Sequence, residues 1–239
     1  HVIYNGVLFS SLHEDQGAAK RLSDEFEILT FISSELPQQF SRLEMALSPK
    51  VYDLRPFLWH NYHDSQGQKW KLDLRYTSYV NISACDEDKL EENALFKELG
   101  TSRRQEVRYA RRDGVFAESS SNVGLLVDLY GKSMQKNGVE IPSSQFCQME
   151  SFLNKILEEK KGKQFIVKND QNKVASVAFF GFDNKRAYYL LGGNDPDKKA
   201  SYSGTIVLWD AFIALCREGI GEVDMEGVNS PQRGWFKLS

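Results

Sequence analysis

The first half of the chain opens with a helical pattern of apolar residues. Over residues 18–47 they recur at steps of three and four, which predicts a helix with one buried face, broken near Pro37. β-Forming residues then dominate residues 54–62 and 70–82, and the turn-forming residues between them predict a long hairpin. The apolar positions that define the helix are Ala18, Leu22, Phe26, Leu29 and Ile32.

The second half alternates between the apolar spacing typical of helices and that typical of strands. Its three consecutive strands predict an antiparallel meander, and the helix and strand that follow predict a right-handed crossover to a parallel strand. The pattern therefore predicts an α/β fold in which helices flank a mixed, mostly antiparallel sheet. The predicted helices cover residues 102–112, begin near Asn122 and Ser143, and cover 204–217; the predicted strands cover 115–118, 164–168, 174–182, 187–191 and 222–228.

Length and composition limit the class of protein. With 239 residues, 41% of them hydrophobic and 26% charged, the chain suits one large or two modest globular domains, not a disordered or fibrous protein. No run approaches the roughly 20 apolar residues of a membrane span, so we expect no membrane-spanning helix. The three cysteines, Cys85, Cys147 and Cys216, form no CxxC pair, which favours a reducing, cytoplasmic setting.

Acidic residues concentrate between the two halves, where five of the eleven residues from 85 to 95 are Asp or Glu. We therefore predict an N-terminal domain over residues 1–84, an acidic helical linker over 85–101 and a C-terminal domain over 102–239. The whole chain has 30 basic and 33 acidic residues and a formal net charge of −3. This balance argues against a protein that coats nucleic acid, but it leaves local basic patches open.

One such patch lies on the predicted helix 102–112. Steps of three, four and eight residues bring Arg104, Arg108, Arg111 and Arg112 close together on neighbouring faces. Guanidinium groups make bidentate contacts with phosphate, so the patch suits a nucleotide-sugar diphosphate or a tRNA backbone. The alternative is a solvated helix paired with the acidic residues just before it, and the sequence leaves both interpretations open.

Two further places could bind an anion or move a proton. The amide groups of Ser203, Gly204 and Thr205 open a predicted helix, and a helix N-terminus suits a phosphate group. In the last predicted strand, Glu222, Asp224 and Glu226 alternate with apolar residues, which predicts three carboxylates on one face. A carboxylate there could accept the proton of an attacking ammonium group, and Asp224 is our candidate.

Other catalytic signatures are absent from the sequence. It has no G-x-S-x-G elbow, no G-x-G-x-x-G run and no P-loop, which argues against a serine hydrolase, a dinucleotide-binding enzyme and a P-loop NTPase. His60 and His63 have a spacing that could bind metal, but no cysteine or carboxylate cluster lies beside them. We therefore predict a structural role for both histidines and no metal site.

Four stretches of the second half resemble the FemABX family of peptidyltransferases, which are tandem GNAT-like proteins. Residues 101–115 are similar to the basic helix of that family, which ends in a Gly-Val turn. Residues 188–194 are similar to its aromatic strand, which ends in a Gly-Gly step, here Gly192-Gly193. Residues 208–228 and the Gly-Trp-Phe-Lys element at 234–237 are similar to the two stretches that follow.

The resemblance implies tandem GNAT-like domains, the first of them degenerate. It also implies transfer of an aminoacyl group from charged tRNA to an amine of a peptidoglycan precursor, without a covalent enzyme intermediate. Lys237 would act at the acyl-transfer site by holding a donor phosphate or stabilising the oxyanion, and Asp224 matches the acidic position of the family. The substrate would be bound by Arg104, Arg108, Arg111, Gly192, Gly193 and Phe236.

Two alternatives accompany this interpretation. Relatives of the wider group resemble CoA-dependent acetyltransferases that act on sugar or polysaccharide precursors, and there Ser203, Gly204 and Thr205 would bind the CoA pyrophosphate. The usual Gln/Arg-x-x-Gly-x-Gly/Ala run of CoA-binding GNAT domains is not present in clean form, since residues 198–204 are only a loose version. The other alternative is a catalytically silent GNAT-like binding module. The acyl donor is therefore expected to be aminoacyl-tRNA or acetyl-CoA.

Overall fold

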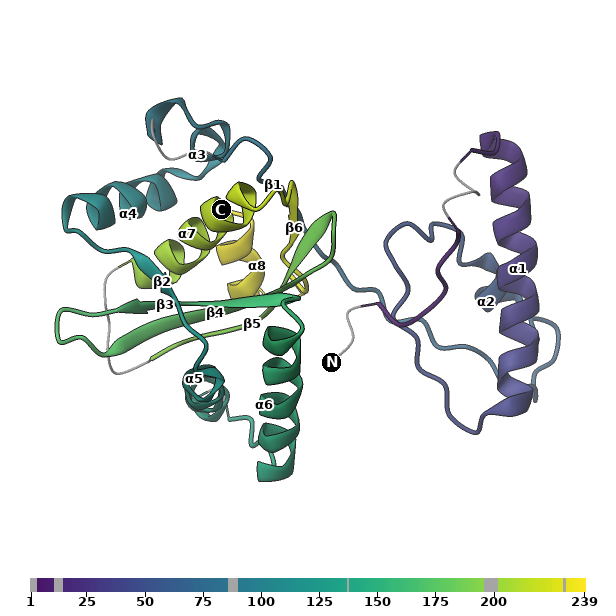
Figure 1. Cartoon of the computed structure of the whole chain (residues 1–239). Coiled ribbons are helices and arrows are strands. Elements are labelled where there is room, and N and C mark those ends of the chain that lie inside the picture. The colour runs from purple at the N-terminus through teal and green to yellow at the C-terminus, as the bar shows by residue number, and fades with distance from the viewer. Residues whose placement is uncertain (1–3, 11–14, 86–89, 137, 196–201, 230) are drawn as a thin grey trace. The chain divides into compact units, whose positions relative to one another are not determined.

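A computed structural model describes residues 4–10, 15–85, 90–136, 138–195, 202–229 and 231–239. The chain divides into two compact units, residues 1–74 and residues 75–239 (Figure 1). Within these described ranges, no helix is both long enough and apolar enough to cross a membrane.

The first unit is built around a long helix, α1 (Ala18–Gln39). Leu29 of α1 is buried in a small core, and the Trp70 indole N–H donates a hydrogen bond to the Ser33 carbonyl at 3.1 Å. The predicted helix is therefore confirmed as far as Gln39. Pro37 lies inside its last turns, so the helix ends soon after the residue at which a break was predicted.

The hairpin predicted over residues 54–82 is wrong. Residues Arg55–Trp59 form a short helix, α2, because Pro56 has a φ suited to a first turn and the Asp53 carboxylate accepts a hydrogen bond from the Arg55 amide at 3.1 Å. In the described part of residues 1–74 there is no β-strand. The tandem arrangement of two GNAT-like domains therefore stays a prediction.

The second unit begins earlier in the chain than the sequence indicated. Strand β1 (Tyr79–Asn81) pairs antiparallel with β6 (Glu222–Asp224), and residues 75–84 belong to the same compact unit as the far end of the chain. The boundary thus lies at residue 74, not at residue 84. Strand pairing between segments about 145 residues apart leaves no local signal in the sequence.

The acidic segment is part of this second unit instead of a linker between halves. It contains the 3₁₀ turn η2 (Leu90–Glu92) and the helix α3 (Ala94–Glu98), while its residues 86–89 lie outside the described residues. Phe96 of α3 is buried and meets the ring of Trp209 edge to face, with centroids 5.8 Å apart. This contact joins the segment to the core of the unit.

Six strands form one sheet in the order β1-β6-β5-β4-β3-β2. All neighbours are antiparallel except β5 and β6, which are parallel and connected through α7, as the predicted crossover requires. The predicted order of helices and strands is confirmed. The remaining elements of this unit are α4 (Thr101–Arg112), β2 (Ala117–Ser119), α5 (Val123–Lys136), α6 (Ser143–Glu158), β3 (Gly162–Lys168), β4 (Val174–Phe182), β5 (Arg186–Asn194), α7 (Ser203–Arg217) and α8 (Pro231–Lys237).

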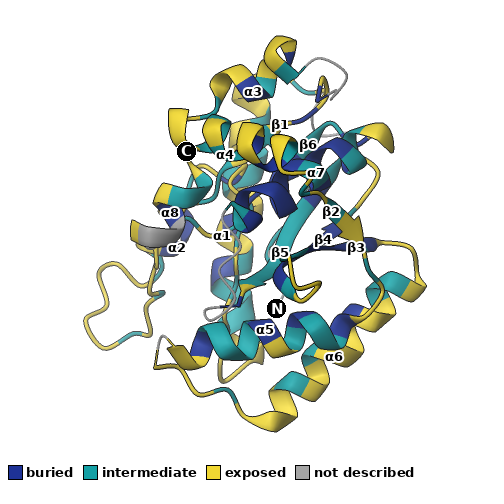
Figure 2. Cartoon of the chain, turned by 90° about the vertical axis from the view of Figure 1, so that its left-hand side faces the viewer, coloured by how far each residue is buried: buried dark blue, intermediate teal, exposed yellow. Residues whose placement is uncertain are grey.

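Helices cover both faces of the sheet. Alternation along β4 sends Phe180 toward α7 and α4, and sends Phe179 toward α5 and α6. Helix α7 is buried on most of its circumference, because ten of its fifteen residues are buried between the sheet and α4 (Figure 2). An apolar helix of this kind needs cover on more than one side, and here α4 and α3 supply it.

Strands β5 and β6 are paired over only three residues. Their register runs from Arg186 opposite Glu222 to Tyr188 opposite Asp224, after which β5 continues to Asn194 with β4 as its paired neighbour. The chain after β6 turns away at Glu226, whose φ of 52° is in the left-handed region. The chain then reaches α8, which lines the cavity described below together with α4 and α7.

Candidate functional site

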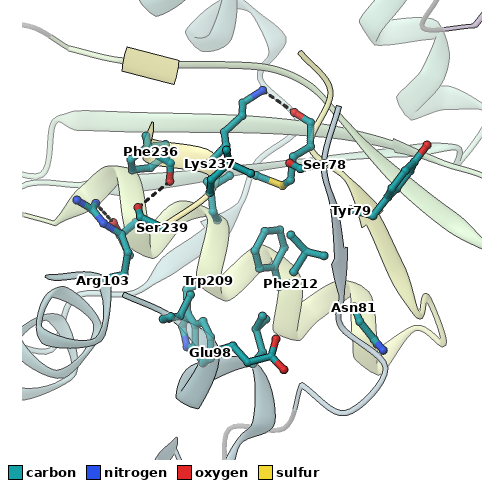
Figure 3. Close-up of a pocket in the computed structure, with 17 residues that line it drawn as sticks. Ser78, Tyr79, Asn81, Glu98, Arg103, Trp209, Phe212, Phe236, Lys237 and Ser239 are labelled. Carbon is teal, nitrogen blue, oxygen red and sulfur yellow. Dashed lines mark hydrogen bonds between the residues drawn. The ribbon is translucent and has the colours of Figure 1, made fainter. Parts of the chain in front are cut away.

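Two adjoining cavities lie on the α4–α7 face of the second unit. The first, the apolar pocket, has a volume of about 260 Å³ and is lined mainly by apolar side chains of α3, α7 and α8, including Leu95, Leu208, Trp209, Phe212 and Phe236 (Figure 3). The second, the polar pocket, has a volume of about 240 Å³ and lies at the N-terminus of α7. Its lining includes Glu106, Asn194, Asp195, Tyr202 and Ser203.

Arg103 of α4 stands at the junction of the two cavities. It lines both of them, together with Thr205 and Phe236. One terminal nitrogen, Nη1, donates to the Glu106 carboxylate at 2.6 Å and to the Thr205 hydroxyl at 2.7 Å. The guanidinium carbon lies 5.2 Å from the centre of the Phe236 ring. In the part of the chain that the structure describes, the Nε–H of Arg103 has no hydrogen-bond partner.

Arg103 was not among the residues predicted from the sequence, although the sequence held a signal for it. Val107 and Ala110 are the buried residues of α4, and Arg103 lies four and seven residues before them. Those steps place Arg103 on the same inward-facing stripe of the helix. An arginine on the buried stripe of an otherwise charged helix was therefore the better candidate for a site inside the unit.

Arg108 and Arg111, two of the predicted phosphate ligands, are paired with carboxylates of the chain itself. Arg108 makes two hydrogen bonds of 2.7 Å to Glu91, as the alternative interpretation of the basic helix predicted. The hydrogen bond from Arg108 lowers the pKa of Glu91. Arg111 forms an ion pair with Asp210 of α7 and donates to the Val115 carbonyl at 3.3 Å. Neither arginine lines a cavity.

Arg104, the third predicted phosphate ligand, is also outside both cavities. Its Nε–H is buried and has no hydrogen-bond partner among the described residues. The three arginines chosen from the sequence are therefore not brought together at one site. The basic helix instead contributes its neighbour, Arg103, to the cavities.

Lys237 lines the apolar pocket, as does Phe236 beside it. Its ammonium group donates to the Met225 carbonyl at 2.5 Å (Figure 3). It also donates to the Gly227 carbonyl at 3.3 Å and lies 5.0 Å from the centre of the Tyr189 ring. These contacts tie α8 to the segment that leaves β6. The role of Lys237 at the reacting carbonyl stays a prediction.

Asp224 lies at the end of β6 and is completely buried. Its Oδ1 accepts hydrogen bonds from the Thr77 hydroxyl and from the Glu226 amide, the latter at 2.8 Å. It lines neither cavity, so the structure does not bring it into the pocket of Lys237. The predicted row of three carboxylates is also wrong, because the strand ends at Asp224 and Glu226 lies beyond it in a left-handed conformation.

Gly192 and Gly193 lie in β5 and line neither cavity. An added Cβ on Gly193 would come within 3.1 Å of the backbone of Leu129 in α5. An added Cβ on Gly192 would come within 2.0 Å of the Tyr189 hydroxyl and 3.0 Å of the Val177 carbonyl. Their small size is therefore explained by close packing, not by a substrate.

Ser203, Gly204 and Thr205 all line the polar pocket at the start of α7. The Ser176 hydroxyl lies 2.6 Å from both the Ser203 hydroxyl and the Asn194 side-chain oxygen, and the Thr205 hydroxyl is held by Glu106. The side chains of Ser203 and Thr205 thus have partners within the protein. The Thr205 amide donates to the Tyr202 carbonyl at 3.1 Å, so this turn can offer a ligand the amides of Ser203 and Gly204, which begin a 15-residue helix.

Comparison with known proteins identifies the family to which the second unit is similar. The family model for the acetyltransferase (GNAT) domain matches residues 98–232, which is more than half of the chain. No curated protein sequence matches. The structure of FemX is similar, with a TM-score of 0.55 and 14% identity over 69% of this chain, and the chain spans only 58% of FemX.

A second similar structure, a conserved protein of unknown function from Bacteroides thetaiotaomicron, has a TM-score of 0.51 and 9% identity. The match covers 69% of this chain and 54% of that one. At these identities the two structures support the fold alone, and the fold agrees with the domain match. The chain therefore belongs to the family of acetyltransferase (GNAT) domains.

Proposed function

We propose that the chain transfers an aminoacyl group from charged tRNA to an amine of a cell-wall peptide precursor. The amine nitrogen attacks the ester carbonyl, a C–N bond forms and the ester C–O bond breaks. The amine gives up one proton and the leaving ribose oxygen gains one. The proposal is supported by the GNAT family match, by the FemX-like fold and by the four stretches that resemble the FemABX family.

The observation that carries the proposal is the position of Arg103 between the two cavities. A positive group there can stabilise the negative charge that develops on the carbonyl oxygen during attack, or hold a phosphate of the donor. Glu106 and Thr205 both bond to Nη1, so they fix the direction of the guanidinium before a substrate arrives. A preorganised donor of this kind needs little reorganisation when charge develops.

A second candidate function is CoA-dependent acetyl transfer, for which the polar pocket is the specific observation. The amide groups at the start of α7 and the positive end of its dipole suit a pyrophosphate, and the guanidinium of Arg103, which is paired with Glu106, adds hydrogen-bond donors beside them. In this reaction a C–N bond forms and the thioester C–S bond breaks, with the amine proton passing to the thiolate. The two candidates share an acceptor amine and differ in the donor.

A thermal-shift titration with CoA and acetyl-CoA distinguishes the donors. Ligand at 100 times its dissociation constant adds about 2.7 kcal/mol to the free energy of unfolding. No shift with either CoA or acetyl-CoA, combined with transfer from charged tRNA in a radiolabel assay, is the result expected for the first candidate. A shift with acetyl-CoA and transfer of its acetyl group would instead establish the second.

The Arg103→Gln variant tests the role of the guanidinium in either reaction. Removing one preorganised donor at a developing oxyanion lowers kcat by about 100-fold to 1,000-fold in a comparable case. Arg112→Gln is the matched control, because Arg112 lies on the same helix, pairs with the neighbouring Asp113 and lines neither cavity. Equal turnover in the two variants would overturn the assignment of Arg103.

A further inference from the structure

The apolar pocket has a wall that suits a hydrocarbon group. Trp209 and Phe212 of α7, both nearly fully buried, and Phe236 of α8 form its aromatic part, and Leu95 and Leu208 add aliphatic surface (Figure 3). Its volume of about 260 Å³ has room for roughly eight heavy atoms, if each takes the ~30 Å³ that a water molecule occupies in the liquid. An acetyl group alone would leave most of this space unfilled.

Positive charge lies at the side of the apolar pocket that adjoins the polar pocket. Arg103, Thr205 and Phe236 line both cavities, so a ligand that extends from one to the other passes these three side chains. A molecule with its phosphates at the start of α7 and its acyl carbonyl beside Arg103 would therefore direct the remainder of its acyl group into the apolar pocket. Two other charged residues line the apolar pocket. Lys237 of α8 is partly buried and donates to the Met225 and Gly227 carbonyls, and Glu98 of α3 is exposed.

We propose that the apolar pocket binds the apolar chain of the transferred acyl group and selects that group by its length. The proposal rests on the proposed function, because it names the part of the acyl donor that this cavity takes. The chemical class is an acyl group with an aliphatic or aromatic body larger than acetyl, such as an apolar aminoacyl group. The pocket thus excludes water from the chain while Arg103 binds the oxygen end.

Simple carboxylates test the pocket without any donor or transfer reaction. Ligand-observed NMR titration of the 239-residue chain with sodium acetate, butyrate and hexanoate at constant ionic strength gives an affinity for each chain length. Burial of each methylene contributes about fourfold in affinity, so hexanoate should bind about sixteenfold more tightly than butyrate. Hexylammonium, which has the same chain length and the opposite charge, should bind more weakly than hexanoate because two cationic side chains, Arg103 and Lys237, line the pocket.

Two variants test whether the carboxylates bind in this cavity. Leu99→Trp adds a ring to a side chain that lines the pocket and should abolish the advantage of hexanoate over acetate. Leu74→Trp is the matched control, because Leu74 is 73% exposed and belongs to the other unit, and it should leave the series unchanged. If Leu99→Trp does not fold, Phe212→Leu enlarges the pocket and should move the preferred ligand from hexanoate to octanoate.

Equal affinities for acetate and hexanoate, or a chain-length series that neither pocket variant changes, would overturn the proposal. Its failure is distinguishable from failure of the proposed function. If the protein transfers aminoacyl groups but its carboxylate binding does not depend on chain length, the proposed function holds and the acyl-chain pocket is refuted. If binding depends on chain length but the protein transfers no acyl group from either donor, the pocket holds and the proposed function is refuted.

Discussion

The ion pair between Arg111 and Asp210 decides whether Arg111 binds substrate or holds the fold together. The carboxylate of Asp210 accepts from Arg111 and also from the Ala117 amide at 2.6 Å, so it joins α4, α7 and the edge strand β2. The two side chains are only 16% and 12% exposed. The perturbation is Asp210→Asn, which keeps the size of the side chain and removes its charge.

The magnitude follows from burial. Removing one partner of a buried ion pair typically costs about 3–5 kcal/mol, because the other charge is left unpaired. Since both groups retain some contact with solvent and the asparagine can still accept from Ala117, we expect a loss of about 3 kcal/mol for Asp210→Asn. In a chain of this size each kcal/mol lowers Tm by roughly 2–4 °C, so Tm should fall by roughly 6–12 °C.

The assay is a double-mutant cycle in which chemical denaturation is followed for Asp210→Asn, Arg111→Met and the double variant. The double variant should be more stable than the sum of the single losses predicts, because it leaves no unpaired charge. Arg108→Ala is the surface control, and we expect no measurable change in Tm because Arg108 and Glu91 form an exposed pair. If neither single variant changed the free energy of unfolding and Arg111→Met weakened substrate binding, the structural role would be refuted.

Three further predictions concern other residues of the unit. Gly193→Ala should lower the free energy of unfolding, measured by chemical denaturation, by about 1–3 kcal/mol, because a Cβ there would press on the backbone of α5. Gly204→Ala is the control and should change this free energy little, because its Cβ would meet only the Asn194 side chain at 3.4 Å. Burial and the neighbouring Asp183 raise the pKa of Tyr188 to about 12, so the folded protein holds this proton more tightly than the unfolded chain does. Stability should therefore fall as the pH rises from about 10 to about 12, and ultraviolet titration of Tyr188→Phe should lack the last phenol transition. Asp224→Asn should lower Tm and keep both limbs of the pH–rate profile; loss of one limb without a change in Tm would establish Asp224 as the proton acceptor.

The sequence predicted the order of elements in the second unit because local patterns carry that information. Leu126 and Leu129 recur at helical spacing, and the turns between the three meander strands contain residues that form tight turns. The same reasoning failed at residues 55–59, where a proline in the first turn and the hydrogen bond from the Arg55 amide to the Asp53 carboxylate favour a helix over the β-forming composition around them. Local turn chemistry prevailed there over composition.

The site was harder to predict than the fold. Helical spacing placed Arg104, Arg108 and Arg111 near one another, but the partners that decide their roles lie elsewhere in the sequence. Glu91 is 17 residues from Arg108, and Asp210 is 99 residues from Arg111. Ion pairs between residues so far apart in the sequence depend on tertiary packing. The positions of arginines on one helix therefore do not show which guanidinium groups are already paired with a carboxylate of the protein.

The pairing of β1 with β6 affects where this domain can be cut from its chain. The family match begins at residue 98, yet β1 lies at Tyr79–Asn81 and Ile82 beside it is completely buried. A protein expressed from residue 98 would leave β6 as a bare sheet edge, open to pairing with other chains. We expect such a fragment to aggregate. Expression from residue 75 keeps the covering strand and is the rational boundary for crystallisation or for isotope-labelled NMR samples.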